Sequence, residues 1–150
     1  MKPILIVANT PSENALILRS AVKNGVAESD FKVIVKPPLE TTAGDVLSCS
    51  GIIIGTTENF GYMSGQIKDF FERIYYPCLN NTEALPWALY VKAGLDGTGA
   101  TRSVEKIVKG LQWKPIQEPL LLKGTFKEEF SLDCKALGAG MAEGLKLGIF

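Results

Sequence analysis

The sequence contains no histidine, and this absence excludes several kinds of active site at once. Ser-His-Asp and Cys-His catalytic groups use an imidazole as base, and many metal sites use it as a ligand, so this chain alone builds neither. An excess of charge of one sign is also missing, because 16 Lys and Arg residues balance 16 Asp and Glu residues. The chain therefore lacks the electrostatic footprint expected for binding nucleic acid or an anionic membrane.

Cysteines are few and long apolar runs are absent. Cys49, Cys78 and Cys134 are isolated in the sequence and share no metal-binding spacing such as C-x-x-C. We expect them to be reduced thiols that pack as small hydrophobic side chains. The apolar run near the N-terminus stops at Asn9, too early for a signal peptide, and no other run reaches membrane-spanning length. The expected location is the cytoplasm.

The apolar residues that are present form a repeating pattern. The length of 150 residues, with 46% apolar and 21% charged residues, predicts one globular domain spanning residues 1–150. Short apolar runs predict strands, namely residues 4–8, 31–35, 52–54, 87–93 and 116–122, the last interrupted by Pro119. Apolar residues at helical spacing lie between most of these runs. The alternation predicts an α/β protein with a doubly wound parallel sheet.

Two of the expected helices carry informative patterns. The clearest helix has Ile67, Phe70, Phe71 and Ile74 at spacings i, i+3, i+4 and i+7. In the last helix, Gly140 and Gly144 lie on the apolar side. We expect these two glycines to let the helix approach a neighbouring helix closely.

Ligands of doubly wound sheets bind beyond the carboxyl ends of the strands, here in the loops 9–15, 55–65 and 94–100. The first loop, "ANTPSENA", lacks the glycines of a dinucleotide-binding fingerprint, and the chain has no P-loop. No acidic residue follows the first or third strand to hold the cation of a receiver domain. No cysteine precedes residue 49 to act as the nucleophile of a low-molecular-weight tyrosine phosphatase.

The first loop has two interpretations that the residues leave open. Thr10, Ser12 and Asn14 come just before a helix, whose N-terminus has free backbone N–H groups and a positive dipole end. Together these donors can hold a phosphate monoester without any basic residue. In the alternative, Ser12 or Thr10 only caps the helix and no ligand binds.

The second loop carries a specific resemblance. The stretch "GTTENFGYMSG", residues 55–65, resembles the pattern G-[ST]-P-T-Y-F-G-x-M-S-G of the flavodoxin-like superfamily. Within it, the most similar branch is that of the NAD(P)H-dependent FMN reductases and the tryptophan-repressor-binding-protein type of quinone reductase. The segment "PLLLKGTFKEEFSLDCKALGAGMAEGL", residues 119–145, is similar to the final strand and helix of that family. The resemblance covers nearly the whole chain and implies a three-layer α/β/α sandwich with a five-stranded parallel sheet in the order 2-1-3-4-5.

The resemblance also implies a noncovalently bound FMN held by all three loops. Its phosphate would be cradled by Thr10, Ser12, Asn14 and Ala15. One side of its isoalloxazine ring would be lined by Thr57, Glu58, Asn59, Phe60 and Gly61. The other edge would be approached by the third loop, with Gly94, Asp96 and Gly97. For Asp96, a role as a turn residue or helix cap is an equal alternative.

The chain departs from the family pattern in the first and second loops. Glu13 stands where the first loop usually has glycine, and Ala15 replaces a hydroxyl residue. In the second loop, Thr57, Glu58 and Asn59 replace the usual P-T-Y, which removes the commonest ring-contacting aromatic side chain. The two carboxylates either point to solvent or point inward, where they would repel the phosphate and the reduced flavin.

The activity implied by the resemblance is that of an FMN-dependent reductase passing electrons from NAD(P)H to a quinone or similar small acceptor. No side chain has to act as an acid or base, and no metal is expected. Two alternatives remain. One is a short-chain flavodoxin that carries electrons, although such carriers are usually acidic and this chain has no net charge. The other is a module that keeps the fold without FMN. The branch often places the flavin near a subunit interface, so a homo-oligomer is compatible with the resemblance.

Overall fold

Apolar runs form the centre of the sheet. The computed structural model describes all 150 residues, and its central strands are β1 (Ile4–Ala8), β3 (Gly51–Thr57) and β4 (Pro86–Ala93). Every residue of β1 is buried, as is every residue of β3 except the last. Because apolar side chains point to both faces of these strands, helices have to cover both faces.

The sheet order is β2–β1–β3–β4–β5, with every pair parallel, where β2 is Val33–Lys36 and β5 is Lys114–Pro115. This confirms the α/β class and the predicted order 2-1-3-4-5. A sixth strand, β6 (Leu120–Lys123), also pairs with β4. Of the predicted fifth strand, residues 116–122, only residues 120–122 form a strand, within β6, and β5 precedes the predicted range. The outer chain is therefore split into two short strands.

The physical reason for the split lies in the segment between β5 and β6. The pairs Trp87–Pro115 and Tyr90–Leu120 bound a stretch in which the outer chain is two residues longer than β4. Pro119, which ends this stretch, has no N–H to donate to a neighbouring strand. The extra residues leave the sheet and rejoin it at Leu120.

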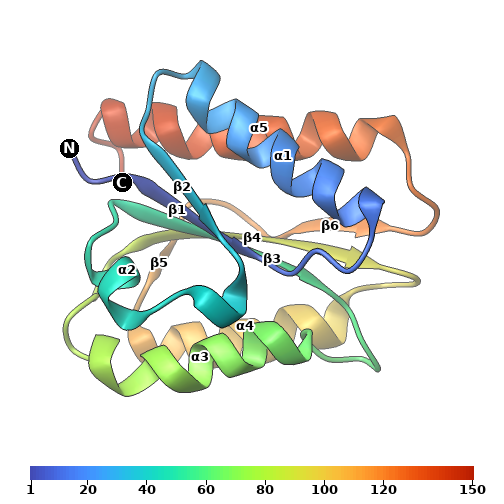
Figure 1. Cartoon of the computed structure of the whole chain (residues 1–150), viewed down its shortest axis with the longest axis horizontal. Helices are drawn as coiled ribbons and strands as arrows, with labels where there is room; N and C mark the ends of the chain where they lie inside the picture. The colour runs from blue at the N-terminus through green and yellow to red at the C-terminus, as the bar shows by residue number, and fades with distance from the viewer.

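Helices form one layer on each side of the sheet (Figure 1). One face is covered by α1 (Glu13–Glu28) and α5 (Glu128–Lys146), and the other by α3 (Gly65–Cys78) and α4 (Thr98–Leu111). A short 3-10 turn, η1 (Pro38–Glu40), and the helix α2 (Ala43–Leu47) occupy the loosely patterned connection between β2 and β3. The predicted apolar face of α3 is buried as expected.

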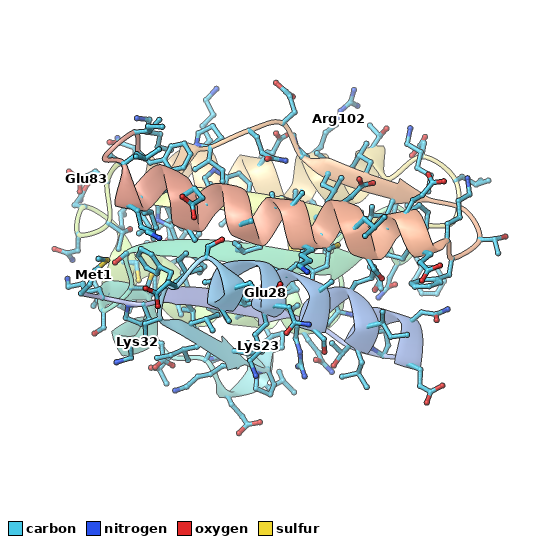
Figure 2. The ribbon with its side chains drawn as sticks, turned by 90° about the horizontal axis from the view of Figure 1, so that it is seen from above. Met1, Lys23, Glu28, Lys32, Glu83 and Arg102 are labelled. Carbon is cyan, nitrogen blue, oxygen red and sulfur yellow. The ribbon has the colours of Figure 1, made fainter.

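The helices α1 and α5 lie side by side (Figure 2) and touch through backbone atoms at two glycines. A Cβ atom on Gly25 would overlap the carbonyl oxygen of Lys135, and one on Gly138 would overlap that of Val22. The prediction that Gly140 and Gly144 make this approach is wrong. Gly140 faces open space, and a Cβ on Gly144 would meet the ring of Phe150 instead of the neighbouring helix.

All three cysteines are free and buried, as expected. Burial raises the pKa of the Cys49 and Cys134 thiols to about 12. Tyr90 is also buried, and its hydroxyl has no hydrogen-bond partner. Burial raises the pKa of Tyr90 above its ordinary value, so the phenol stays neutral. None of the helices combines the length and the apolar character that crossing a membrane requires.

The α1–α5 contact predicts opposite effects of adding a methyl group at two glycines. Gly25→Ala should lower the free energy of unfolding by about 1–3 kcal/mol, because the two backbones must separate to admit the methyl group. Gly140→Ala should raise it by about 0.5–1 kcal/mol, because that helical position has free space. Urea unfolding monitored by circular dichroism measures both. Equal effects at the two positions would contradict the backbone contact.

The unpaired Tyr90 hydroxyl predicts that its removal stabilises the protein. Tyr90→Phe should raise the free energy of unfolding by about 1 kcal/mol, since a buried hydroxyl without a partner loses its hydration on folding. The contrasting variant is Thr82→Val, because the Thr82 hydroxyl accepts from Trp113 Nε1 at 2.8 Å and donates to Cys78 O at 2.9 Å. Thr82→Val should cost about 1–3 kcal/mol in the same unfolding assay. Destabilisation by Tyr90→Phe would show that the hydroxyl has a partner in solution.

Candidate functional site

The three loops expected to carry function meet at one edge of the molecule. They follow β1, β3 and β4, whose carboxyl ends point in the same direction because the strands are parallel (Figure 1). The hollows along the helices, with volumes of about 260 to 450 Å³, have no lining residue in these loops. No group of three or more His, Cys, Asp or Glu side chains is arranged to hold a metal ion.

The β1–α1 loop leaves several hydrogen-bond donors without a partner in the protein. The Ser12 hydroxyl accepts from Ala15 N at 3.2 Å, so the capping interpretation of Ser12 is correct. Ala15 is buried and its N–H is taken. The side chains of Thr10 and Asn14 make no hydrogen bond within the protein, and neither do the backbone N–H groups that precede Ala15: Thr10, Ser12, Glu13 and Asn14. The cap therefore uses the N–H of Ala15 and leaves the N–H groups before it without a partner in the protein.

A side-chain link joins the first loop to the second. Asn9, which is buried, donates from Nδ2 to Thr57 Oγ1 at 3.1 Å and accepts from Thr57 N at 3.2 Å. The Thr57 hydroxyl also lies 3.0 Å from Asn59 Oδ1. The link ties the end of β1 to the end of β3. Asn9 is not among the residues predicted from the sequence to form the site. Its place as a polar residue directly after a buried strand could have indicated it.

The second loop ends in a tight hairpin. Asn59 and Tyr62 exchange backbone hydrogen bonds of 2.9 and 3.0 Å, which leaves Phe60 and Gly61 as the two turn residues. Both have positive φ, 53° and 70°, as a type I′ turn requires. For Phe60 this conformation is strained, since it has a Cβ. The turn presents the Phe60 ring fully to solvent, with an exposed fraction of 107%.

Glu58 takes neither of the two orientations considered from the sequence. Its Oε2 accepts from the backbone N–H of Ala100 at 3.0 Å, in the first turn of α4. Its own backbone N–H donates to Lys92 O at 2.9 Å. The carboxylate thus lies at the positive end of a helix dipole, where a negative charge is stabilised. Glu13, in contrast, is exposed and makes no ion pair.

The third loop combines structural and exposed residues. Asp96 Oδ1 accepts from Thr98 N at 2.9 Å, which is the contact of a turn residue, and the N-cap position of α4 is Gly97. Gly97 has φ 75°, a conformation that favours glycine, whereas Gly94 has free space around it. Leu95 was not among the predicted site residues, yet its side chain is 88% exposed at the loop tip. Only the structure reveals its exposure, because from the sequence a leucine side chain is expected to be buried in the core.

The second and third loops also touch directly. A Cβ on Gly99 would overlap the carbonyl oxygen of Gly61 and lie 2.6 Å from its carbonyl carbon. The hairpin carrying Phe60 therefore rests on the first turn of α4. Of the predicted site residues, those at 57–61 thus lie against the first turn of α4 at Gly99 and Ala100, while those at 10–15 form a separate cluster joined to them through Asn9.

Comparisons with known proteins rest on structure alone. No protein-family model matches the sequence, and a search of the curated proteins found no match. Among solved structures, a flavodoxin from the domain Archaea is similar with a TM-score of 0.83 and 18% identity, covering 96% of this chain and 99% of that one. Oxidised Flavodoxin 2 from Bacillus cereus gives a TM-score of 0.79 and 19% identity, covering 94% and 98%.

A third similar structure is part of a larger protein. The Flv1 flavodiiron core from Synechocystis sp. PCC6803 is similar with a TM-score of 0.78 and 16% identity, and the match covers 97% of this chain but 36% of that one. At these identities the likeness establishes architecture. With its three layers, its parallel strand order 2-1-3-4-5 and its loops gathered at the carboxyl edge, the chain has the flavodoxin-like fold.

Proposed function

We propose that this chain binds FMN noncovalently and functions as a redox protein. The observation that carries the proposal is the cluster of unpaired donors at the N-terminus of α1. Four backbone N–H groups and the side chains of Thr10 and Asn14 have no partner in the protein, beside the positive end of a 16-residue helix. Such groups bind phosphate oxygens without a basic side chain. Glu13 is exposed, so its carboxylate can remain in water when the phosphate binds.

The ring would lie against the second and third loops. Phe60 and Leu95 are exposed apolar side chains on these two loops, and covering them with a planar apolar ring removes that surface from water. Backbone groups of residues 57–61 would face the polar edge of the ring. Bound FMN would supply the electron-transfer chemistry. The protein's part is to bind and orient the ring, which needs no acidic or basic side chain.

Within this function, we propose a reductase that passes electrons from NAD(P)H to a quinone or similar small acceptor. Its supports are the resemblance of residues 55–65 to the reductase branch and the zero net charge of the chain. The second candidate is a one-electron carrier. It is favoured by the similar structures named flavodoxin, of which this chain covers 99% and 98%. A cytoplasmic location suits either candidate.

The proposed phosphate site predicts that FMN binds more tightly than riboflavin, which lacks the phosphate. Flavin-stripped protein should quench FMN fluorescence with micromolar or lower Kd and bind riboflavin at least about tenfold more weakly, the equivalent of one good charged contact. Equal affinities for the two flavins would place the phosphate outside the α1 N-terminus. Failure to bind either flavin would leave only the module that keeps the fold without the cofactor.

The charge of Glu13 should weaken FMN binding. Glu13→Gln should lower the Kd for FMN several-fold at low salt, and the effect should shrink as salt screens the charge. Glu83→Gln is the matched control, because Glu83 is exposed, makes no ion pair and precedes β4, whose length of about 23 Å separates it from the carboxyl edge and exceeds the Debye length of about 10 Å at 0.1 M salt. Equal changes for the two variants would mean that net charge, and not the position of Glu13, sets the affinity.

Steady-state turnover separates the two candidates. FMN-loaded protein should oxidise NADH or NADPH with a soluble quinone as acceptor, at rates at least about tenfold above those of free FMN, because a reductase must orient the nicotinamide toward the bound ring. Absorbance at 340 nm measures the rate. Rates equal to those of free FMN, together with tight FMN binding, would support the electron carrier.

A further inference from the structure

The N-terminus of α4 is capped from outside the helix. Its N-cap residue is Gly97, which has no side chain to accept from the first-turn N–H groups. Two carboxylates do this instead: Asp96 accepts from Thr98 N, and Glu58 accepts from Ala100 N. Asp96 belongs to the same loop as the helix end. Glu58 belongs to the β3–α3 loop, 42 residues away in the sequence, so of these two carboxylates only Glu58 ties the helix end to another loop.

A second hydrogen bond joins the same two segments on the other side of the hairpin. Met63 N donates to Ser103 Oγ at 3.1 Å, and the Ser103 hydroxyl donates to Ala100 O at 2.8 Å. Between these two links, the Gly61 carbonyl lies against Gly99. The hairpin is therefore held on α4 before, at and after its turn. Phe60 projects from the turn of the hairpin into solvent.

We propose that Glu58 is a positioning residue: its hydrogen bond to Ala100 locks the hairpin onto α4 and fixes Phe60 in place before the flavin arrives. The proposal rests on the proposed FMN site for its consequence in binding, but not for the lock itself. Each contact that holds the exposed turn with its left-handed Phe60 reduces the ordering that binding would otherwise require, and such ordering opposes association. Because the lock orders the turn before binding, the loss of conformational entropy does not oppose FMN binding.

The lock requires an acceptor oxygen at the end of a side chain of this length. Glu58→Gln keeps the length and the oxygen, so it should keep the lock while removing the negative charge. Glu58→Ala removes the acceptor. Asp96→Ala is the matched control, because it also removes a carboxylate from the α4 N-terminus but breaks no contact between loops.

Amide hydrogen exchange of the flavin-free full-length chain tests the lock directly. In Glu58→Ala, amide exchange at Tyr62, Met63 and Ala100 should become about tenfold faster than in the unchanged protein. Local opening of the hairpin then costs less free energy, because the hydrogen bond between Glu58 and Ala100 is already absent. In Glu58→Gln these rates should stay within about threefold, as the amide oxygen still accepts. Asp96→Ala should speed exchange at Thr98 and leave Tyr62 and Met63 unchanged. Far-UV circular dichroism confirms that each variant is folded.

FMN affinity then tests the consequence for binding. Glu58→Ala should raise the Kd for FMN about tenfold, with Glu58→Gln near the unchanged protein, because the loss comes from the lock and not from charge. Unchanged exchange at Tyr62 and Met63 in Glu58→Ala, or the same acceleration in Asp96→Ala, would overturn the proposal. If no variant binds FMN, the proposed function fails, while the exchange comparison still decides whether Glu58 locks the loops.

Discussion

The organisation of this protein depends on the complete burial of its central strands. β1 and β3 carry apolar side chains on both faces, and helices cover both faces of the sheet. A polar group in the middle of these strands would be buried without a partner, which is costly. Chemistry is therefore confined to the ends of the strands. The parallel arrangement collects three of those ends, with the helix N-termini that follow them, at a single edge.

The loops at this edge differ in how far their polar groups satisfy one another. In the second and third loops, Glu58 and Asp96 accept from backbone N–H groups of α4, and Thr57 is paired with Asn9. In the first loop, the donors before Ala15 remain unpaired. The edge thus has a part whose polar groups satisfy one another, made of the hairpin and the α4 N-terminus, and a part whose donors are unpaired. The proposed FMN, with a phosphate at one end and a flat ring at the other, would use both parts.

Much of the fold could be predicted from the sequence, because apolar runs and helical spacing report burial directly. The strand at Ile4–Ala8 and the buried face of α3 are examples. Contacts between distant segments could not be predicted. Nothing local distinguishes Gly140, which faces open space, from Gly138, which meets the backbone of Val22. Similarly, Ala100, the partner of Glu58, is 42 residues away in the sequence. From the sequence, the Glu58 carboxylate is only a departure from the pattern of a ligand-binding loop, whereas in the structure it accepts a hydrogen bond from the first turn of a helix.

The split outer strand has a consequence for the exposed border of the sheet. Lys114 N and Ile116 N donate inward to Leu85 O and Trp87 O, so the nitrogen of Pro115 between them faces outward. Proline has no hydrogen to offer there, and β5 ends at this residue. A strand from another molecule finds no continuous row of donors along this border. The interruption therefore acts as protection against edge-to-edge aggregation, a hazard that every open sheet has to manage.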